Sequence, residues 1–257
     1  MRHIISLFIL QSSSFAARRR HQQIISFSSM SSSKRTSSEK KRKRAVEQQQ
    51  PWFSKFTQDD PLYIDYMSSE WGYEKQTEEE LFEKLSLEGA QSGLSWRTIL
   101  HKREAYRKAF HGFHIDKVAA MTEGDVERLL SKKSNDSTQL VVRHRGKLES
   151  VINNAAVIQK LKADGTISSF KEHLWSFVNN QPILNQWHSL SDMPSKTDES
   201  ECMSKALKKH GFKFVGPTTC YAFMQSCGFV IDHPVGTKHW AEAEKRLKKR
   251  KGGYQIR

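Results

Sequence analysis

Apolar residues recur at helical spacing through most of the chain after Thr77, and no sustained strand-like alternation is present. Thr77 and Glu80 form a capping box ahead of Leu81 and Leu85. Later apolar series predict two more helices, and their members are Leu148, Val151, Ile152, Ala155 and Ile158, and then Phe170, Leu174 and Phe177. The pattern predicts an all-α fold.

The helix that begins after Thr77 carries an acidic residue on its apolar face. Leu81, Leu85, Glu88 and Ser92 follow one another at i, i+4, i+7 and i+11, so they share one face. An ionised carboxylate buried without a partner is costly. Glu88 is therefore either a structural group, which caps amides or pairs with an arginine, or a functional one. The spacing alone leaves both interpretations open.

Helix-start signals continue along the chain. Ser95 is expected to cap a helix that carries Trp96, another helix starts at Asp116, and Thr122 with Asp125 makes a second capping box. Residues 131–139 are rich in Lys, Ser, Asn and Asp, which predicts a polar surface loop.

Residues 205–228 have the pattern of a helix-hairpin-helix. A helix ends near His210, a short segment with Gly216 follows, and Thr218 or Thr219 opens a second helix that runs to Cys227. Hairpin amides and a helix N-terminus can hold a DNA phosphate. The residues predicted to contact DNA are Lys208, Lys209, Lys213, Gly216 and Thr218. An ordinary αα-hairpin is the alternative.

The net charge of +14 over 257 residues is concentrated at the two ends. Residues 1–50 hold 11 Lys or Arg and 2 Glu, residues 241–257 hold 7 and 2, and residues 51–240 are balanced with 24 of each sign. Basic tails favour polyanions such as nucleic acid. We expect a disordered basic targeting segment over 1–50, a helical domain over 51–240, and a basic tail over 241–257 that frays after a helix.

The first 50 residues hold two possible targeting signals. Arg18, Arg19 and Arg20 among serines resemble a transit peptide, whereas residues 40–44, which read KKRKR, resemble a nuclear localisation cluster. We expect a nuclear protein, with the mitochondrion or plastid as the alternative. The apolar run over 4–10 is too short for a bilayer, so no membrane partner is expected. Three cysteines without a CxxC pair indicate a reducing compartment.

An ordered set of segments resembles the DNA-3-methyladenine glycosylase I family of the helix-hairpin-helix glycosylase superfamily. The match covers about residues 52–240 in one order. Its segments are Asp60–Ile64, Tyr66, Glu70–Gly72, Leu87–Gly89, Gly93–Trp96, Arg143–Lys147, Trp175–Asn179, Lys205–Lys209, Gly211–Gly216 and Asp232–His233. The resemblance implies two helical lobes with a base pocket between them.

The resemblance also implies roles for particular side chains. Glu88 would contact a flipped base, Trp96 would stack on it, Tyr66 would help to close the pocket, and Trp71 and Tyr63 would form its walls. These residue types suit a purine alkylated at N3, which is flat and cationic: aromatic faces bind it by stacking and cation–π attraction, and a carboxylate adds a charge-assisted hydrogen bond. No lysine is placed like a Schiff-base nucleophile, so a monofunctional enzyme that leaves an abasic site is expected.

Two features depart from the family pattern. Asp232 lies downstream of the hairpin, where related glycosylases use an aspartate to hold water or stabilise the sugar cation, although its spacing is short; a helix cap is the alternative.

Bacterial members hold zinc with two Cys and two His. The corresponding positions here are Ser54, Met67, His233 and Thr237. Only His233 is a competent ligand, so no zinc or other cofactor is expected, and Trp52 with Phe53 would hold the ends by packing.

The sequence therefore predicts a monomeric base-excision repair glycosylase that acts on 3-methyladenine in double-stranded alkylated DNA. The alternative is a DNA-binding paralogue that kept the fold and the hairpin but lost catalysis. A related glycosylase with a broadened or shifted base preference is a third possibility.

Overall fold

The computed structural model describes residues 51–257, and the predictions for residues 1–50 lie outside the described residues. The α-helices, in chain order, are α3 (Ser54–Thr57), α4 (Pro61–Ser69), α5 (Glu78–Gln91), α6 (Trp96–Ala109), α7 (Ile115–Ala119), α8 (Glu123–Ser131), α9 (Arg145–Ala163), α10 (Phe170–Ser176), α11 (Asp198–Lys209), α12 (Pro217–Ser226) and α13 (Lys238–Leu247). Short 3-10 helices are η1 (His111–Phe113), η2 (Ser137–Gln139) and η3 (Leu190–Asp192). The predicted helical fold is confirmed.

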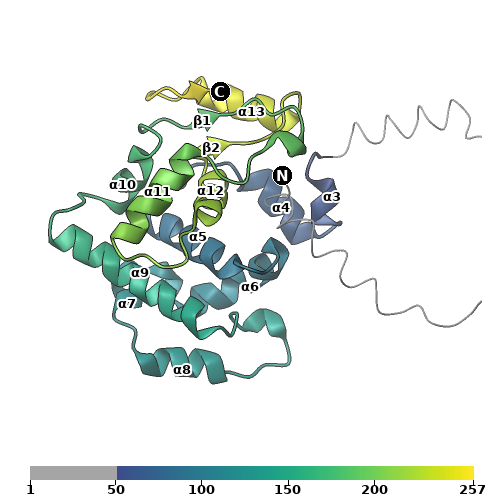
Figure 1. The fold of residues 1–257 in the computed structure, drawn as a ribbon. Coiled ribbons are helices and arrows are strands. Elements are labelled where there is room, and N and C mark those ends of the chain that lie inside the picture. Colours follow the sequence, from purple (N-terminus) through teal and green to yellow (C-terminus); the bar gives the residue numbers. More distant parts are fainter. Residues whose placement is uncertain (1–50) are drawn as a thin grey trace, which may run out of the picture.

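Helix α5 lies at the centre of the molecule and contacts α6, α9, α10 and α12 (Figure 1). Helices α6–α9 lie on one side of it, and α11–α13 lie on the other (Figure 1). Every residue of α5 from Leu81 to Gln91 is buried, although Glu83, Lys84 and Glu88 are charged types. One buried cluster extends from Phe53 to Val230, so the two groups of helices share a core. Every face of α5 therefore lies in the protein interior.

The helix starts follow the local rules that the sequence predicts. The Thr77 hydroxyl accepts a hydrogen bond from the Glu80 amide (3.1 Å), and the Glu80 carboxylate accepts one from the Thr77 amide (3.0 Å). The Ser95 hydroxyl accepts from the Thr98 amide and caps α6. Gly216 caps α12, which begins at Pro217 rather than at Thr218 or Thr219, because proline at the first helical position loses no hydrogen bond.

The C-terminal residues are folded, which corrects the prediction of a frayed tail over 241–257. Strands β1 (Ile183–Leu184), β2 (Val230–Ile231) and β3 (Gln255–Ile256) form a small parallel sheet in the order β2-β1-β3. Ala243 and Leu247 of α13 are buried in a small second cluster with Leu184 and Ile231. The folded domain therefore extends past residue 240, because the apolar face of α13 packs against side chains of β1 and β2.

The fold defines the positions of the polar loop and of the three cysteines. Residues 132–137 are exposed, as predicted for the polar loop. Cys220 and Cys227 are buried and Cys202 is exposed, and all three are free thiols. Within residues 51–257, no helix has the length and apolar character needed to cross a membrane.

Candidate functional site

Glu88 lies on the last turns of α5 with only 6% of its surface exposed. Burial raises the pKa of Glu88 above its ordinary range, against the opposing charge of Lys84 and a hydrogen bond from Ser226. Ser226 ends α12, so the carboxylate is held between two helices that are far apart in the sequence. The structural alternative of an arginine partner is not what the structure shows: its neighbours are a lysine and a hydroxyl.

The Tyr63 and Tyr66 rings of α4 lie near this carboxylate, and the Trp96 ring of α6 lies beside Tyr66. The Tyr66 and Trp96 ring centroids are 5.2 Å apart with their planes tilted by 40°, and the Tyr63 ring lies 6.4 Å from that of Tyr66. Burial raises the pKa of both tyrosines, and the charge of Glu88 is the next contribution. Glu88, Tyr66, Trp96 and Tyr63 therefore converge as predicted, and we call these four residues the Glu88 cluster.

The turn between Glu88 and Trp96 is fixed by a lysine from α9. Lys147, itself 7% exposed, donates from Nζ to the carbonyl oxygens of Ala90 (2.8 Å) and Ser92 (2.5 Å). These carbonyls belong to the end of α5, where helical partners run out. Lys147 thereby connects α9 to the turn between α5 and α6. Its motif, Arg143–Lys147, is part of the sequence resemblance, but no role for it followed from the pattern.

A buried lysine also adjoins the cluster, and the sequence analysis did not single it out. Lys84 lies one turn before Glu88 on α5, is 1% exposed, and its Nζ lies 4.3 Å from the Tyr66 ring centroid. The same Nζ pairs with the Glu70 carboxylate at 2.6 Å. The i, i+4 spacing of Lys84 and Glu88 was the available signal, but in isolation it predicts only an ordinary helix-surface ion pair.

Trp71 packs among rings that join the Glu88 cluster through Phe56, whose ring centroid lies 5.7 Å from that of Trp52 and 6.1 Å from that of Tyr63. The Trp71 ring centroid is 5.6 Å from that of Trp52 and 5.1 Å from that of His233, and these contacts join the start of the domain to the segment before α13. His239 and Phe53 extend the cluster, with centroids 5.2 Å apart. The ends are thus held by packing that includes Trp52 and Phe53, as expected.

The residues at the family's zinc positions do not suit that metal. The Thr237 hydroxyl caps α13 by accepting from the Trp240 amide, and Met67 is buried in the hydrophobic core. Burial lowers the pKa of His233 to about 3, and His239 is the neighbouring imidazole. Among residues 51–257, no group of three or more His, Cys, Asp or Glu could hold an ion. Structural zinc takes four donors, so the fit fails.

Asp232 is placed as a structural group, which corrects the prediction of a catalytic one. It is fully buried, and both oxygens are saturated. Oδ1 accepts from Asn185 (2.6 Å) and Trp187 (2.8 Å), and Oδ2 accepts from Tyr221 (2.5 Å) and Gln225 (2.7 Å). Four donors use the acceptor sites that a water nucleophile would need. Asp232 thus links α12 to the sheet by hydrogen bonds. This structural role explains why Asp232 follows the hairpin at a shorter spacing than a catalytic aspartate would.

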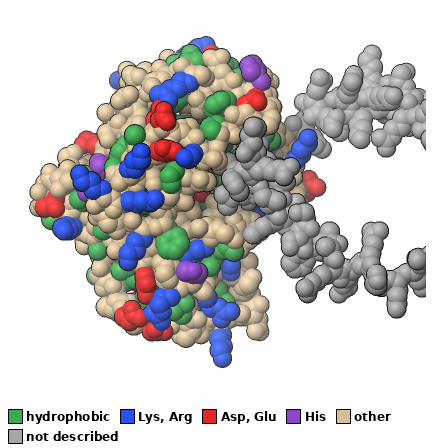
Figure 2. Space-filling model, viewed as in Figure 1, with side chains coloured by type: hydrophobic (Ala, Val, Ile, Leu, Met, Phe, Trp, Pro, Cys, Tyr) green, Lys and Arg blue, Asp and Glu red, His purple; other side chains and the backbone are tan. Residues whose placement is uncertain are grey.

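A short connection joins α11 to α12, and the basic residues of this hairpin are exposed. Lys208, Lys209 and Lys213 are exposed, and Gly216 and Thr218 are half-buried around the start of α12. Several Lys and Arg side chains occupy the face that carries α11 (Figure 2).

The hairpin is rigidly connected to the Glu88 cluster. Asn154 of α9 holds the hairpin by accepting from the Lys213 amide and donating to the Lys213 carbonyl. Gly89, next to Glu88, lets Phe214 approach, since a Cβ there would lie 3.2 Å from the Phe214 Cβ.

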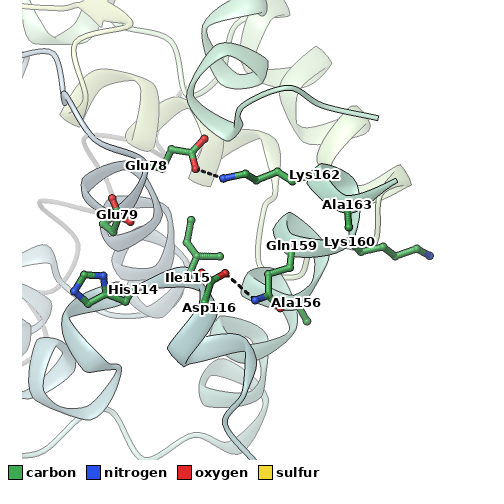
Figure 3. A pocket seen from close by; sticks show the side chains of 10 residues that line it. All are labelled: Glu78, Glu79, His114, Ile115, Asp116, Ala156, Gln159, Lys160, Lys162 and Ala163. Carbon is green, nitrogen blue, oxygen red and sulfur yellow. Dashed lines mark hydrogen bonds and ion pairs between the residues drawn. The ribbon is translucent and has the colours of Figure 1, made fainter. Parts of the chain in front are cut away.

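A separate surface groove lies between the start of α5, α7 and α9 (Figure 3). Two of its polar pairs are joined within the groove: Lys162 pairs with Glu78 at 2.7 Å, and Gln159 donates to Asp116 at 2.8 Å. It contains no member of the Glu88 cluster. The groove therefore offers no comparable chemistry.

Comparison with known proteins gives consistent matches. Residues 55–239 match the family described as methyladenine glycosylase. DNA-3-methyladenine glycosylase 1 of Escherichia coli (strain K12) is 50% identical over 177 residues, which are 69% of this chain and 90% of that protein. DNA-3-methyladenine glycosylase of Haemophilus influenzae is 47% identical over 172 residues, 67% of this chain and 89% of that protein.

Solved structures give the same result. The crystal structure of a 3-methyladenine DNA glycosylase I aligns with a TM-score of 0.65 and 48% identity, over 70% of this chain and 94% of that one. The enzyme from Staphylococcus aureus, whose structure concerns recognition of 3-methyladenine, aligns with a TM-score of 0.65 and 38% identity over 70% and 92%.

Proposed function

This chain belongs to the methyladenine glycosylase family, and from that premise we propose how its residues release a damaged base from DNA. It is a base-excision repair glycosylase, a hydrolase of N-glycosyl bonds, and its base is 3-methyladenine. The observation that carries the proposal is the convergence of the Glu88 carboxylate with the Tyr66 and Trp96 rings. A carboxylate beside two aromatic faces suits a flat cation better than a neutral base.

The mechanism starts from a base that is already a good leaving group. Methylation at N3 gives the purine a positive charge, and its flipping costs less than that of a normal base. Trp96 and Tyr66 stack on the flipped ring, and Glu88 accepts a hydrogen bond from its exocyclic amine. As the glycosidic bond breaks, the base leaves with the bonding electrons as a neutral molecule, and water adds to the sugar carbon and releases one proton to solvent. The products are the free base and an abasic site, without strand cleavage.

Release of 3-methyladenine from methylated duplex DNA by the full-length chain tests the proposal. We expect base release that is complete in a single turnover and leaves strands intact until the abasic sites are cleaved by alkali. Tight DNA binding without release would instead favour the inactive, DNA-binding paralogue. Release of other alkylated purines at equal rates would favour a broadened base preference.

We propose that the helix-hairpin-helix binds a phosphate of double-stranded DNA at the start of α12. Gly216→Asp is expected to weaken DNA affinity about tenfold, because it places a negative charge beside the phosphate. The fold should tolerate it, since aspartate is a good helix cap and a Cβ at Gly216 would have Thr219 Oγ1 as its nearest neighbour, at 4.0 Å.

Gly216→Asn is the matched control, since it adds a cap of the same shape without charge. Fluorescence anisotropy with labelled duplex, repeated over a salt series, measures both variants. Equal affinities for the Asp and Asn variants would contradict a phosphate site at the hairpin.

We also propose that this chain works without the structural zinc of its bacterial relatives. The support is the donor set described above, in which His233 is the single competent ligand at the family's four positions. The aromatic cluster of Trp52, Trp71 and His233 joins the same ends of the domain. Elemental analysis of the purified, active protein should find zinc well below one equivalent, and chelator should leave its melting temperature unchanged. Stoichiometric zinc that survives dialysis would contradict this.

The remaining proposals concern assembly and location. We propose that the protein is a monomer, because residues of one chain complete the site. We propose a nuclear location, because residues 40–44 are all basic. Light scattering of the free protein and imaging of a version with these five residues replaced by alanine test the two proposals separately. A stable dimer, or unchanged nuclear localisation, would count against them.

A further inference from the structure

Lys84 brings a positive charge into the place where the proposed mechanism puts the charge of the base. Its Nζ lies 4.3 Å from the Tyr66 ring centroid and 5.3 Å from that of Trp96, and these two centroids are 5.2 Å apart. The ammonium therefore lies at comparable distances from both rings. Both contacts are within the range of cation–π attraction, which is strongest when the cation is desolvated, as here.

The ion pair with Glu70 does not by itself account for Lys84. Glu70 also accepts two hydrogen bonds from Arg103, at 2.6 and 3.0 Å, and pairs with Lys75 at 3.2 Å. Arg103 also pairs with Glu83, so three cations (Lys75, Lys84 and Arg103) lie against two carboxylates. Lys84, which is 1% exposed, is therefore part of a local excess of positive charge.

Lys84 also acts on the proposed base-binding carboxylate. It precedes Glu88 by one helical turn on α5, and its charge favours the ionised form of Glu88. The other groups around Glu88 are Ser226 and Cys227 at the end of α12 and Tyr63 and Tyr66 on α4. Among these side chains, Lys84 is the cation.

We propose that Lys84 is a specificity-determining residue of the base pocket, whose ammonium occupies the aromatic site of Tyr66 and Trp96 and competes with a cationic purine for it. The inference rests on the proposed function, because it takes the Glu88 cluster as the base pocket. In the base-free protein the lysine supplies the positive charge that Glu88 and the two rings otherwise lack. When a charged base binds, that charge becomes a like-charge neighbour.

The consequence is a pocket that discriminates less strongly in favour of cationic bases than its rings and carboxylate alone would. Repulsion between two unit charges about 5 Å apart inside a protein lowers the affinity for the cationic ligand by a factor on the order of a hundred. A neutral purine feels no such repulsion. Pairing with Glu70 reduces the effect, so removal of the Lys84 charge should raise the affinity for a cation by about tenfold.

The test compares a permanently cationic ligand, 3,9-dimethyladeninium, with neutral 9-methyladenine, by calorimetric titration of the full-length protein at neutral pH. Lys84→Met, which keeps the length of the side chain, should bind the cation about tenfold more tightly than the wild type and the neutral base within about twofold. Lys84→Arg, which keeps the charge, should retain the wild-type ratio of the two affinities.

Several outcomes would overturn the proposal. They are equal changes for both ligands in Lys84→Met, no binding of the cation to Lys84→Met, or the same ratio in the Met and Arg variants. A borohydride-trapped adduct with DNA that disappears in Lys84→Met would show a nucleophile instead. Failure of the proposed function is distinguishable, since it appears as absence of 3-methyladenine release by the wild type.

Discussion

Glu88→Gln is expected to slow single-turnover release of 3-methyladenine by about a hundredfold to a thousandfold, the range seen when one preorganised electrostatic group is removed. Glutamine keeps the size of the side chain and an oxygen that can accept the Ser226 hydrogen bond. It removes the negative charge that attracts the cationic base and holds its exocyclic amine. The loss should appear in the rate of the chemical step more than in affinity for undamaged duplex, since the proposed DNA contacts of the hairpin are unchanged.

The pH dependence provides an independent measurement of the same residue. Burial raises the pKa of Glu88 to about 7, so the carboxylate loses its charge as the pH falls through that value. Release by the wild type should therefore decline below about pH 7, and the profile of Glu88→Gln should be flat there. A carboxyl group whose pKa is higher in the folded than in the unfolded state lowers the free energy of unfolding at pH values where the group is ionised in both states. Glu88→Gln should consequently melt no lower than the wild type at pH 8, and an equal pH profile for both proteins would contradict the assignment.

Local rules explain which parts of this fold and site the sequence could predict. The capping box of Thr77 with Glu80 and the Ser95 cap depend on contacts within one turn, so the starts of α5 and α6 follow from sequence alone. The i, i+7 relation of Leu81 and Glu88 likewise fixes a shared face. Convergence with Tyr66 and Trp96 needed the family resemblance, because α4 and α6 meet α5 only through tertiary packing.

The features that the sequence did not predict depend on contacts between distant segments. Ser226 reaches Glu88 because α12 packs on α5. Composition predicts a solvated basic tail for the C-terminal residues, yet Arg246 donates to the Gly72 carbonyl at 2.7 Å and Arg250 pairs with Glu74 at 2.9 Å. Charge counting cannot distinguish such anchored arginines from free ones. The position of Asp232 after the hairpin predicts a catalytic role. Its four hydrogen-bond donors come from segments whose positions in space local sequence patterns do not predict.

Gly228→Ala is expected to destabilise the protein by about 3 kcal/mol, the largest stability effect of a single methyl group in the described chain that we anticipate. Gly228 follows α12 with φ of +73°, a conformation that costs an alanine roughly 1–2 kcal/mol. A Cβ there would also lie 2.8 Å from the Glu74 amide nitrogen and 2.9 Å from the Tyr73 carbonyl carbon. Both are backbone atoms, so the overlap adds about 1–3 kcal/mol. The melting temperature should fall by roughly 6–12 °C.

Gly165→Ala is the matched control, because Gly165 also has positive φ, +74°, but a Cβ there would meet nothing within 4 Å. It should show only the conformational cost, roughly 1–2 kcal/mol, in the same thermal melts. The difference between the two variants isolates the close approach of the 72–74 segment to the end of α12. That approach also matters for the site, since Ser226 and Cys227 directly precede Gly228 and adjoin Glu88. Gly228→Ala should therefore slow base release at temperatures where it is still folded, and Gly165→Ala should not. Equal melting temperatures for the two variants would show that the 72–74 segment moves aside without cost, and that the end of α12 is held by other contacts.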